Sequence, residues 1–429
     1  MLNKEPDISS KNIYLQFENL FGQFLEGKGT APNTDIESPK LIIVIDALDE
    51  CEVTDLKLIM PRLVKIGLKL FITSRPNSPT LALLRGLEIT PIVRLQTLDA
   101  GPDIRTYLKS RMTAIKEEYD RNSGHDGSDG WPSDGLIERL TQLASPLFIA
   151  AATICRMIDI NEEGLNSLMS PEDVIGSLLK SQRSGLKGVE IIYTQILEKL
   201  DPGSIFRAVM GPIVVMFDSL HAEGLSQLLG VERKGILACL TRFTEIIDIS
   251  RPEAPIKPFH LSLRDFLTGT SAPEHFRIHE RETHRALAKH CAHLLNTKLY
   301  QNICKVKSPG RLRSEVPEEK IRNSLPPELQ YACRYWVDHL EASGDLLQDN
   351  DETHILLQNT FPMWIEALAW MDHLSESPRM IHQMLMFLHV RNALLVSTCS
   401  ITTLSLQILN CHVKSEGKRC RAISFPPGM

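Results

Sequence analysis

The hydrophobic pattern of the chain changes character at about residue 100. Residues 41–45 read Leu-Ile-Ile-Val-Ile without polar alternation, which favours a parallel strand covered on both faces by helices. Residues 68–73 and 92–95 are further short apolar runs that predict strands, and residues 55–66 predict a helix between the first two. We therefore expect an α/β arrangement in the first hundred residues.

After this point the pattern predicts helices almost throughout. From Asp103 onward the apolar positions recur at helical spacing, and the breaks are a glycine-rich acidic loop at 122–130 and turn-rich stretches at 250–258 and 305–317. An amphipathic helix is also expected ahead of the first strand. Its apolar face would contain Phe17, Leu20, Phe21, Phe24 and Leu25. The expected fold class is α/β and then mainly α.

Composition narrows the class of protein without naming a partner. The 429 residues suffice for roughly two to four domains. A formal charge of -6 provides no electrostatic footprint for nucleic acid. The absence of a leader and of any apolar run near ~20 residues predicts a cytoplasmic protein without a membrane partner. Nine cysteines without a CxxC pair suit buried reduced thiols better than disulfides or a zinc site.

Charged residues follow the first two predicted strands. Asp46, Asp49 and Glu50 come directly after the first, and Arg75 follows the second. The carboxyl ends of parallel strands meet at one edge of a sheet, where ligands bind. A carboxylate there can hold a hydrated Mg²⁺ against phosphate oxygens, and a second can orient an attacking water. An acidic cluster after a strand can also be a helix cap or a solvated turn, and the second strand end favours the phosphate site.

Several segments together resemble one protein family. Val-Ile-Asp-Ala-Leu-Asp-Glu-Cys at 44–51 and Leu-Phe-Ile-Thr-Ser-Arg-Pro at 70–76 resemble the Walker B and sensor segments of NACHT domains in fungal NOD-like receptors. These receptors belong to the STAND class of P-loop signalling NTPases. Ala-Ser-Pro-Leu-Phe-Ile at 144–149 resembles the Gly-x-Pro region of that family. The similarity continues, in family order, at residues 192–197, 259–267, 331–336 and 364–368.

The resemblance implies a domain order and a switching function. It implies a truncated parallel-sheet nucleotide-binding domain over residues 1–99, a helical domain over 100–200 and a winged helix over 201–270. A C-terminal helical region with an irregular tail would cover 271–429. In the family, nucleotide exchange or hydrolysis changes how the domains pack during innate immune signalling. The favoured interpretation is a partial signalling module of this kind.

The resemblance also assigns roles after the two strands. Mg²⁺ with ATP or ADP, or with GTP, would be the cofactor, and Asp46 would bind the metal. Asp49 or Glu50 would position the water, and Arg75 would sense the terminal phosphate. A cation near phosphate makes charge-assisted hydrogen bonds of roughly 1.5 to 3 kcal/mol.

Two further residues are implicated through later segments. Pro146 would lie near the base, and His260 would reach the phosphates of a bound diphosphate and hold the closed state. The structural alternatives are that Pro146 begins a helix at 147–158 and that His260 is a core histidine bound to a backbone carbonyl.

The chain departs from the family at the Walker A loop. Residues 22–30 read G-x-x-x-x-G-K-G-T, one inserted glycine from the consensus, but an amphipathic helix rather than an apolar strand precedes them. They end ten residues before the Walker B strand, which leaves no room for a P-loop helix and crossover. A cradle of about five hydrogen bonds at roughly 1.5 kcal/mol each accounts for a micromolar affinity, ~8 kcal/mol. We therefore expect impaired nucleotide binding, and no WD repeats follow.

Other functions stay open beside this interpretation. A slow ATP or GTP hydrolase would need a P-loop lost from a truncated gene prediction or supplied by a partner chain. DNA binding through the winged helix ranks last because its basic residues are interspersed with acidic ones. The expected partners are proteins, either the same chain or full-length receptor homologues. One predicted helix carries His284, His290, Cys291 and His293, but only two of these can share a face, so ordinary helix positions are expected there.

Overall fold

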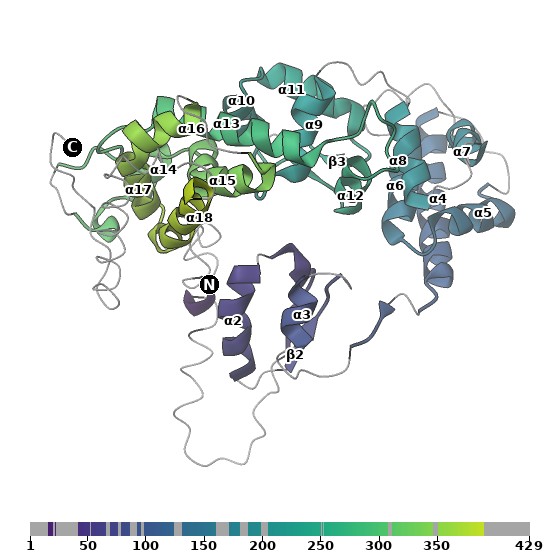
Figure 1. Cartoon of the computed structure of the whole chain (residues 1–429). Helices are drawn as coiled ribbons and strands as arrows, with labels where there is room; N and C mark the ends of the chain where they lie inside the picture. Colours follow the sequence, from purple (N-terminus) through teal and green to yellow (C-terminus); the bar gives the residue numbers. More distant parts are fainter. Residues whose placement is uncertain are drawn as a thin grey trace, which may run out of the picture. The chain divides into compact units, whose positions relative to one another are not determined.

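The protein is described here by a computed structural model whose contacts divide the chain into two compact units (Figure 1). The first unit is Met1–Leu98 with Met371–Ser375, and the second is Asp99–Trp370 with Glu376–Met429. The structure describes residues 16–19, 22, 42–51, 53–65, 69–75, 79–85, 92–95, 98–123, 131–159, 171–180, 188–198, 205–249, 251, 253–307, 311–345 and 351–389. Most of the expected N-terminal helix, residues 23–30 and the tail from residue 390 lie outside these ranges.

A two-stranded parallel sheet is the centre of the first unit. The strands pair from Ile42 opposite Lys69 to Ile45 opposite Ile72. A parallel pair needs a long crossover, and a helix supplies it here. The predicted strands at 41–45 and 68–73 and the predicted helix between them are confirmed. The elements are β1 (Ile42–Ile45), η2 (Leu48–Glu50), α2 (Val53–Lys65), β2 (Lys69–Ile72) and α3 (Pro79–Arg85).

Helices cover one face of this sheet. Ile43, Ile45, Leu70 and Ile72 pack into a core with the fully buried Met60 of α2 and with leucines of α3. The other face is open, because successive side chains of a strand point to opposite sides. Its residues Ile42, Val44 and Phe71 are 59%, 66% and 61% exposed. Our expectation that helices cover both faces is therefore wrong for the described residues.

The predicted strand at residues 92–95 is not formed. Residues 92–94 have no regular structure, and Ile92, Val93 and Leu95 are exposed. Among the described residues this sheet consists of β1 and β2 alone. An apolar segment forms a strand only where a neighbouring strand supplies backbone hydrogen bonds and a surface to pack on. Among the described residues, this segment pairs with no strand and its apolar side chains are exposed.

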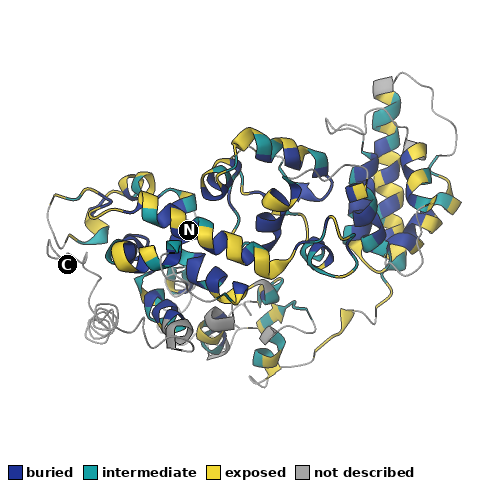
Figure 2. Ribbon diagram, turned by 45° about the horizontal axis from the view of Figure 1, so that its top comes forward, coloured by how far each residue is buried: buried dark blue, intermediate teal, exposed yellow. Residues whose placement is uncertain are grey.

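The second unit begins with a bundle of helices. Its first elements are α4 (Gly101–Ser123), α5 (Asp134–Ala144), α6 (Phe148–Ile158), α7 (Pro171–Lys180) and α8 (Gly188–Glu198). The buried stripe of α4 consists of Ile104, Leu108, Met112 and Ile115 at helical spacing. Figure 2 shows the buried residues of this bundle as stripes between the helices. Helix α6 confirms the helix predicted from residue 147 onward.

A smaller group of helices follows, in the region expected to be a winged helix. Its elements are α9 (Phe206–Val215), α10 (Ala222–Leu229), α11 (Arg233–Leu240), η4 (Thr241–Phe243), β3 (Ile247–Asp248), β4 (Lys257–Pro258) and α12 (Ser262–Thr268). The two short strands pair antiparallel. Phe206 anchors the core, with its ring centroid 5.4 Å from that of Phe243 and 5.2 Å from that of Phe276.

The remaining helices complete a mostly helical second unit. They are α13 (Glu280–Lys298), η5 (Arg313–Glu315), α14 (Glu318–Ser324), α15 (Pro327–Ser343), α16 (Glu352–Ile355), the π-helix η6 (Leu356–Thr360), α17 (Phe361–Trp370) and α18 (Ser377–His389). Between the last two, most of η7 (Leu374–Glu376) belongs to the first unit. The indoles of Trp336 and Trp364 meet edge to face at 5.5 Å, and Trp364 donates a hydrogen bond to the Cys333 carbonyl at 2.8 Å. The overall class is mainly α with one small parallel sheet.

Candidate functional site

The carboxyl ends of β1 and β2 bring Asp46 and Thr73 together. The Thr73 hydroxyl donates a hydrogen bond to Asp46 Oδ1 and accepts one from Ala47 N at 2.8 Å. Backbone hydrogen bonds continue past the strands, from Thr73 N to Ile45 O at 3.0 Å and from Leu48 N to Thr73 O at 2.9 Å. Both strand ends are therefore fixed relative to each other, and the exposed carboxylate of Asp46 has a defined position at their edge.

Ala47 turns the chain immediately after Asp46. Its φ and ψ of 51° and 48° lie in the left-handed region, which costs a non-glycine residue roughly 1 kcal/mol or more. The hydrogen bond from Ala47 N to the Thr73 hydroxyl helps to hold this conformation. The turn directs η2, and with it Asp49, back towards the end of β2.

Asp49 and Arg75 bind each other at the same edge. Asp49 Oδ1 accepts a hydrogen bond from Arg75 N at 2.9 Å, and Asp49 Oδ2 lies 3.4 Å from Arg75 Nε. The Asp49 side chain is 8% exposed and that of Arg75 is 41% exposed. Both oxygens of Asp49 contact Arg75, so this carboxylate holds Arg75 in place at the strand edge, and its role in positioning a water stays a prediction. Glu50 belongs to η2, but its side chain lies outside the described part of the structure.

The chemistry of this edge fits a hydrated Mg²⁺. Asp46 and Thr73 offer a carboxylate and a hydroxyl, and Mg²⁺ in nucleotide sites takes one or two carboxylates and keeps several waters. Within the described residues, no group of three or more His, Cys, Asp or Glu side chains could hold a metal ion. A metal at this edge would therefore depend on oxygens of water or phosphate beside Asp46.

Pro146 lies between α5 and α6 in the second unit. The Ser145–Pro146 peptide bond is cis, and Pro146 and the next two residues are exposed. The ring of Phe148 meets that of Tyr107 edge to face at 6.1 Å. Helix α6 begins at Phe148, so Pro146 precedes the helix and does not occupy its first turn.

His260 lies just before α12, where its ring is exposed. Its Nδ1 accepts a hydrogen bond from Ser262 N at 3.1 Å and lies 2.8 Å from Ser262 Oγ. The same Oγ lies 2.8 Å from the hydroxyl of Tyr193 in α8. The alternative of a core histidine is therefore wrong, and the ring is joined through Ser262 to α8.

Arg156 connects the end of α6 with the segment that contains His260. Its guanidinium lies 3.8 Å from the ring centroid of Phe259, and Nη1 donates to Glu245 O at 3.4 Å. At a rise of 1.5 Å per residue, the step from Phe148 to Arg156 spans roughly 12 Å. Pro146 and His260 thus lie near opposite ends of α6. The sequence reasoning missed Arg156, whose only signal was an arginine in the last turn of an apolar helix.

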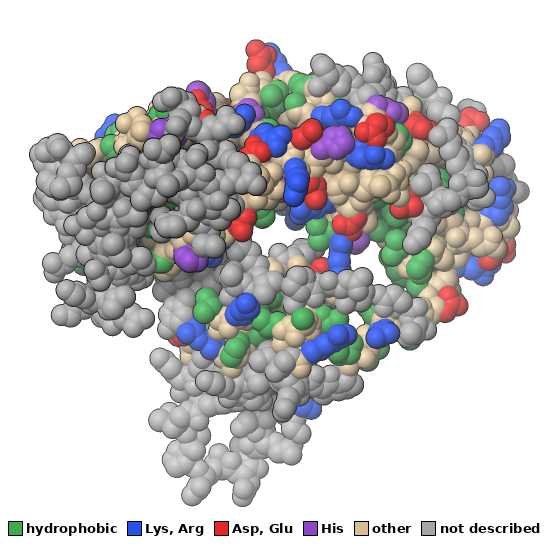
Figure 3. All heavy atoms as spheres, viewed as in Figure 1, with side chains coloured by type: hydrophobic (Ala, Val, Ile, Leu, Met, Phe, Trp, Pro, Cys, Tyr) green, Lys and Arg blue, Asp and Glu red, His purple; other side chains and the backbone are tan. Residues whose placement is uncertain are grey.

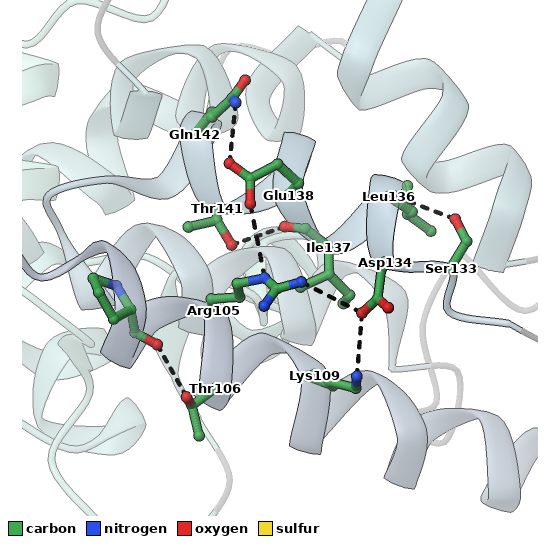
Figure 4. A network of polar contacts seen from close by, with 11 residues as sticks. Arg105, Thr106, Lys109, Ser133, Asp134, Leu136, Ile137, Glu138, Thr141 and Gln142 are labelled. Carbon is green, nitrogen blue, oxygen red and sulfur yellow. Dashed lines mark hydrogen bonds and ion pairs between the residues drawn. The ribbon is translucent and has the colours of Figure 1, made fainter.

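A groove of about 870 Å³ runs between α4 and α5 (Figure 4). Lys109 Nζ lies 3.1 Å from Asp134 Oδ1, and Arg105 pairs with Asp134 at 3.4 Å and with Glu138 at 3.7 Å. The hydrogen bond from Lys109 and the neighbouring positive charges lower the pKa of Asp134. These cations and carboxylates neutralise one another across the groove and hold the two helices together.

The hydroxyl groups of this groove are also engaged. Thr106 donates to Pro102 O at 3.0 Å, and Thr141 donates to Ile137 O at 2.8 Å. Both threonine hydroxyls therefore donate to carbonyls of their own helices rather than into the groove. Its geometry favours a structural contact between helices over a ligand site.

The histidines and cysteine of α13 do not share one environment. His284 and Cys291 are buried, whereas His293 is exposed and pairs with Glu352 at 3.1 Å. Among the six described cysteines, five are buried, and burial raises the pKa of the Cys155 thiol to about 12. Such thiols are poor nucleophiles.

The charges on the surface form no single-signed stripe on the face shown in Figure 3. Lys and Arg side chains lie there among Asp and Glu side chains. In the part of the chain that the structure describes, no helix has the length and apolar character to cross a membrane. Comparison of the whole chain with protein-family models, with curated proteins and with solved structures finds no match in any of the three. The NACHT resemblance therefore stays a prediction based on the motifs.

Proposed function

We propose that the chain is a partial signalling module of the NACHT type that works by packing against protein partners and binds nucleotide weakly at most. In this proposal the edge after β1 and β2 is the remnant of a phosphate site. Asp46 would face Mg²⁺, and Arg75 would face the terminal phosphate. The roles of Pro146 near the base and of His260 at the phosphates come from the family resemblance and stay predictions.

One observation carries the proposal: Asp49 and Arg75 pair with each other at the edge where Asp46 meets Thr73. Two parallel strands ending in an acid and a cation support a phosphate site. The ion pair also supports impairment, because a nucleotide would have to draw Arg75 away from Asp49 before either residue could act on phosphate. Without about five cradle hydrogen bonds, little affinity is left to drive that exchange.

The open face of the sheet supports a protein partner. Ile42, Val44 and Phe71 expose aliphatic and aromatic surface on a parallel sheet, a class of sheet whose two faces are normally covered. A second copy of the chain or a receptor homologue would cover these side chains. Light scattering of the purified chain beside Phe71→Lys tests this part, and a monomer at every concentration counts against self-association.

Titration calorimetry with ATP and ADP in the presence of Mg²⁺ tests the nucleotide part. The full chain is compared with Asp46→Asn, which keeps the shape of the side chain and removes its charge. The matched control is Glu18→Gln, an exposed carboxylate of the same unit. We expect no binding tighter than about 1 mM in any of the three proteins. A dissociation constant of about 1 mM corresponds to a binding free energy of only ~4 kcal/mol, which is the most we expect without the cradle.

Micromolar binding that Asp46→Asn abolishes and Glu18→Gln retains would overturn the impairment. It would support the slow hydrolase instead, and ATP turnover should then be measured with Asp49→Asn. Binding that survives Asp46→Asn would mean that the nucleotide sits elsewhere, which would remove the phosphate role from this edge.

A further inference from the structure

Two histidines and a tyrosine form a buried hydrogen-bonded chain in the second unit. His284 Nδ1 of α13 lies 2.7 Å from His339 Nδ1 of α15, and His339 Nε2 lies 2.7 Å from the Tyr331 hydroxyl. All three side chains are buried, with His339 completely inaccessible. Neither the strand edge nor the groove between α4 and α5 uses these groups.

The contact between the two imidazoles limits their protonation. A hydrogen bond between two Nδ1 atoms needs one N–H and one lone pair. One ring must therefore be neutral at Nδ1, and two protonated rings would direct N–H groups and positive charges at each other. Even a single proton is opposed, because burial disfavours the charged imidazolium.

The chain also holds the loop between α9 and α10. The ring of Phe217 stacks on the imidazole of His284 at a centroid distance of 5.7 Å and on the ring of Tyr335 at 5.5 Å. It meets the imidazole of His339 in a tilted arrangement at 4.9 Å. A backbone hydrogen bond joins Phe217 to the Tyr331 hydroxyl. The two rings therefore contribute a large part of the contact between this loop and α13 and α15, beside Tyr335 and the pair of Asp218 with Arg334.

Few charges face these rings. Arg264 of α12 and Glu280 of α13 act on His284 in opposite directions, and His284 is the titratable neighbour of His339. Around Tyr331 the titratable neighbours are Cys291 of α13, Tyr335 of α15 and Asp218 of the loop. In the described structure Asp218 also pairs with Arg334 at 3.7 Å. No carboxylate among these groups is hydrogen-bonded to either imidazole. None of them therefore supplies a paired negative charge that would stabilise two protonated rings.

Burial is the main cause that lowers the pKa of both histidines, to about 3 for His339. A histidine released to water titrates near 6.5. Between these pH values the opened state binds more protons than the closed state, so closure weakens as the pH falls. The contribution of the neutral imidazoles to the stability of the closed state is complete above about pH 6.5 and is lost progressively as the pH falls below this value.

We propose that His284, His339 and Tyr331 form a pH-sensitive latch that holds the Phe217 loop on α13 and α15 while the imidazoles are neutral and releases it on acidification. Release would free the segment between α9 and α10 from the helices that follow it in the chain. This device is independent of nucleotide and of the proposed function.

Hydrogen–deuterium exchange of the full chain tests the latch. The reporter is the peptide around Phe217, whose exchange is measured at pH 7.5 and pH 5.5 and corrected for intrinsic chemical exchange. Release of His339 should raise the opening equilibrium about tenfold over this interval, and His284 adds to this rise, so we expect more than a tenfold rise in the unmodified chain. His284→Asn places an amide near Nδ1 and removes one titrating ring, and its rise should fall to about tenfold.

The control is His382→Asn, which removes an exposed histidine of α18 and should respond like the unmodified chain. An unmodified chain whose Phe217 peptide exchanges equally at both pH values overturns the latch, whatever the variants do. A folded His284→Asn variant whose rise equals that of the unmodified chain overturns it as well, because the titrating group would then lie elsewhere. Circular dichroism at pH 7.5 shows whether that variant is folded.

Discussion

At the scale of single residues, the two aspartates after β1 differ in what holds them. The Asp49 side chain is largely buried, accepts a hydrogen bond from the backbone N–H of Arg75 and forms an ion pair with its guanidinium, whereas Asp46 is exposed beside Thr73. Asp49→Ala removes both acceptors from Arg75 and should destabilise the first unit by about 1 to 3 kcal/mol. Asp46→Ala should cost less than about 1 kcal/mol. Urea unfolding followed by circular dichroism measures both.

Equal losses of stability in the two variants would contradict this difference. Arg75→Lys provides a second check, since lysine keeps the charge and the backbone N–H but cannot place Nε beside Asp49. The sequence predicted that Asp46, Asp49 and Arg75 share one edge, because parallel strands end together. It could not predict that Asp49 and Arg75 bind each other, since that depends on the left-handed turn at Ala47.

At the scale of elements, one glycine sets how closely two helices approach. A Cβ atom at Gly188, the first residue of α8, would lie 1.9 Å from Leu143 O of α5. Gly188→Ala must therefore push α5 and α8 apart and should cost about 1 to 3 kcal/mol. Gly176→Ala in α7 meets nothing within 4 Å and should stabilise its helix by up to about 1 kcal/mol. Tryptophan fluorescence during urea unfolding compares the two alanines, and a neutral Gly188→Ala would rule out the close approach.

The same scale shows where pattern reasoning ends. Long periodic segments such as α4 and α6 and the strand-helix-strand unit of β1, α2 and β2 were predictable, because burial repeats along them. The run at 92–95 has equally apolar residues but pairs with no strand among the residues that the structure describes, and no local signal distinguishes it from β2. Gly188 carries no sequence signal either, because its role lies in a contact with a distant carbonyl.

At the scale of the whole molecule, the two units have cores of unequal size. The first relies on a small cluster that includes Phe17, Leu56, Met60 and Leu63, and one face of its sheet is open. The second contains the Phe206 and Trp364 clusters and most of the buried residues. A small core with exposed apolar surface provides less stabilisation, so the first unit should unfold at the lower urea concentration.

The position of the tryptophans makes this order measurable. All four, Trp131, Trp336, Trp364 and Trp370, belong to the second unit, whereas circular dichroism reports helices of both. We expect circular dichroism to begin its transition before tryptophan fluorescence, since probes of different units need not coincide. Met60→Ala empties a fully buried site of the first unit and should lower the free energy of unfolding of that unit by about 2 to 5 kcal/mol. The midpoint of the fluorescence transition should stay unchanged. If Met60→Ala shifts both probes equally, the two units unfold as one cooperative body, and the pairing of Asp49 with Arg75 would then be stabilised by the whole chain.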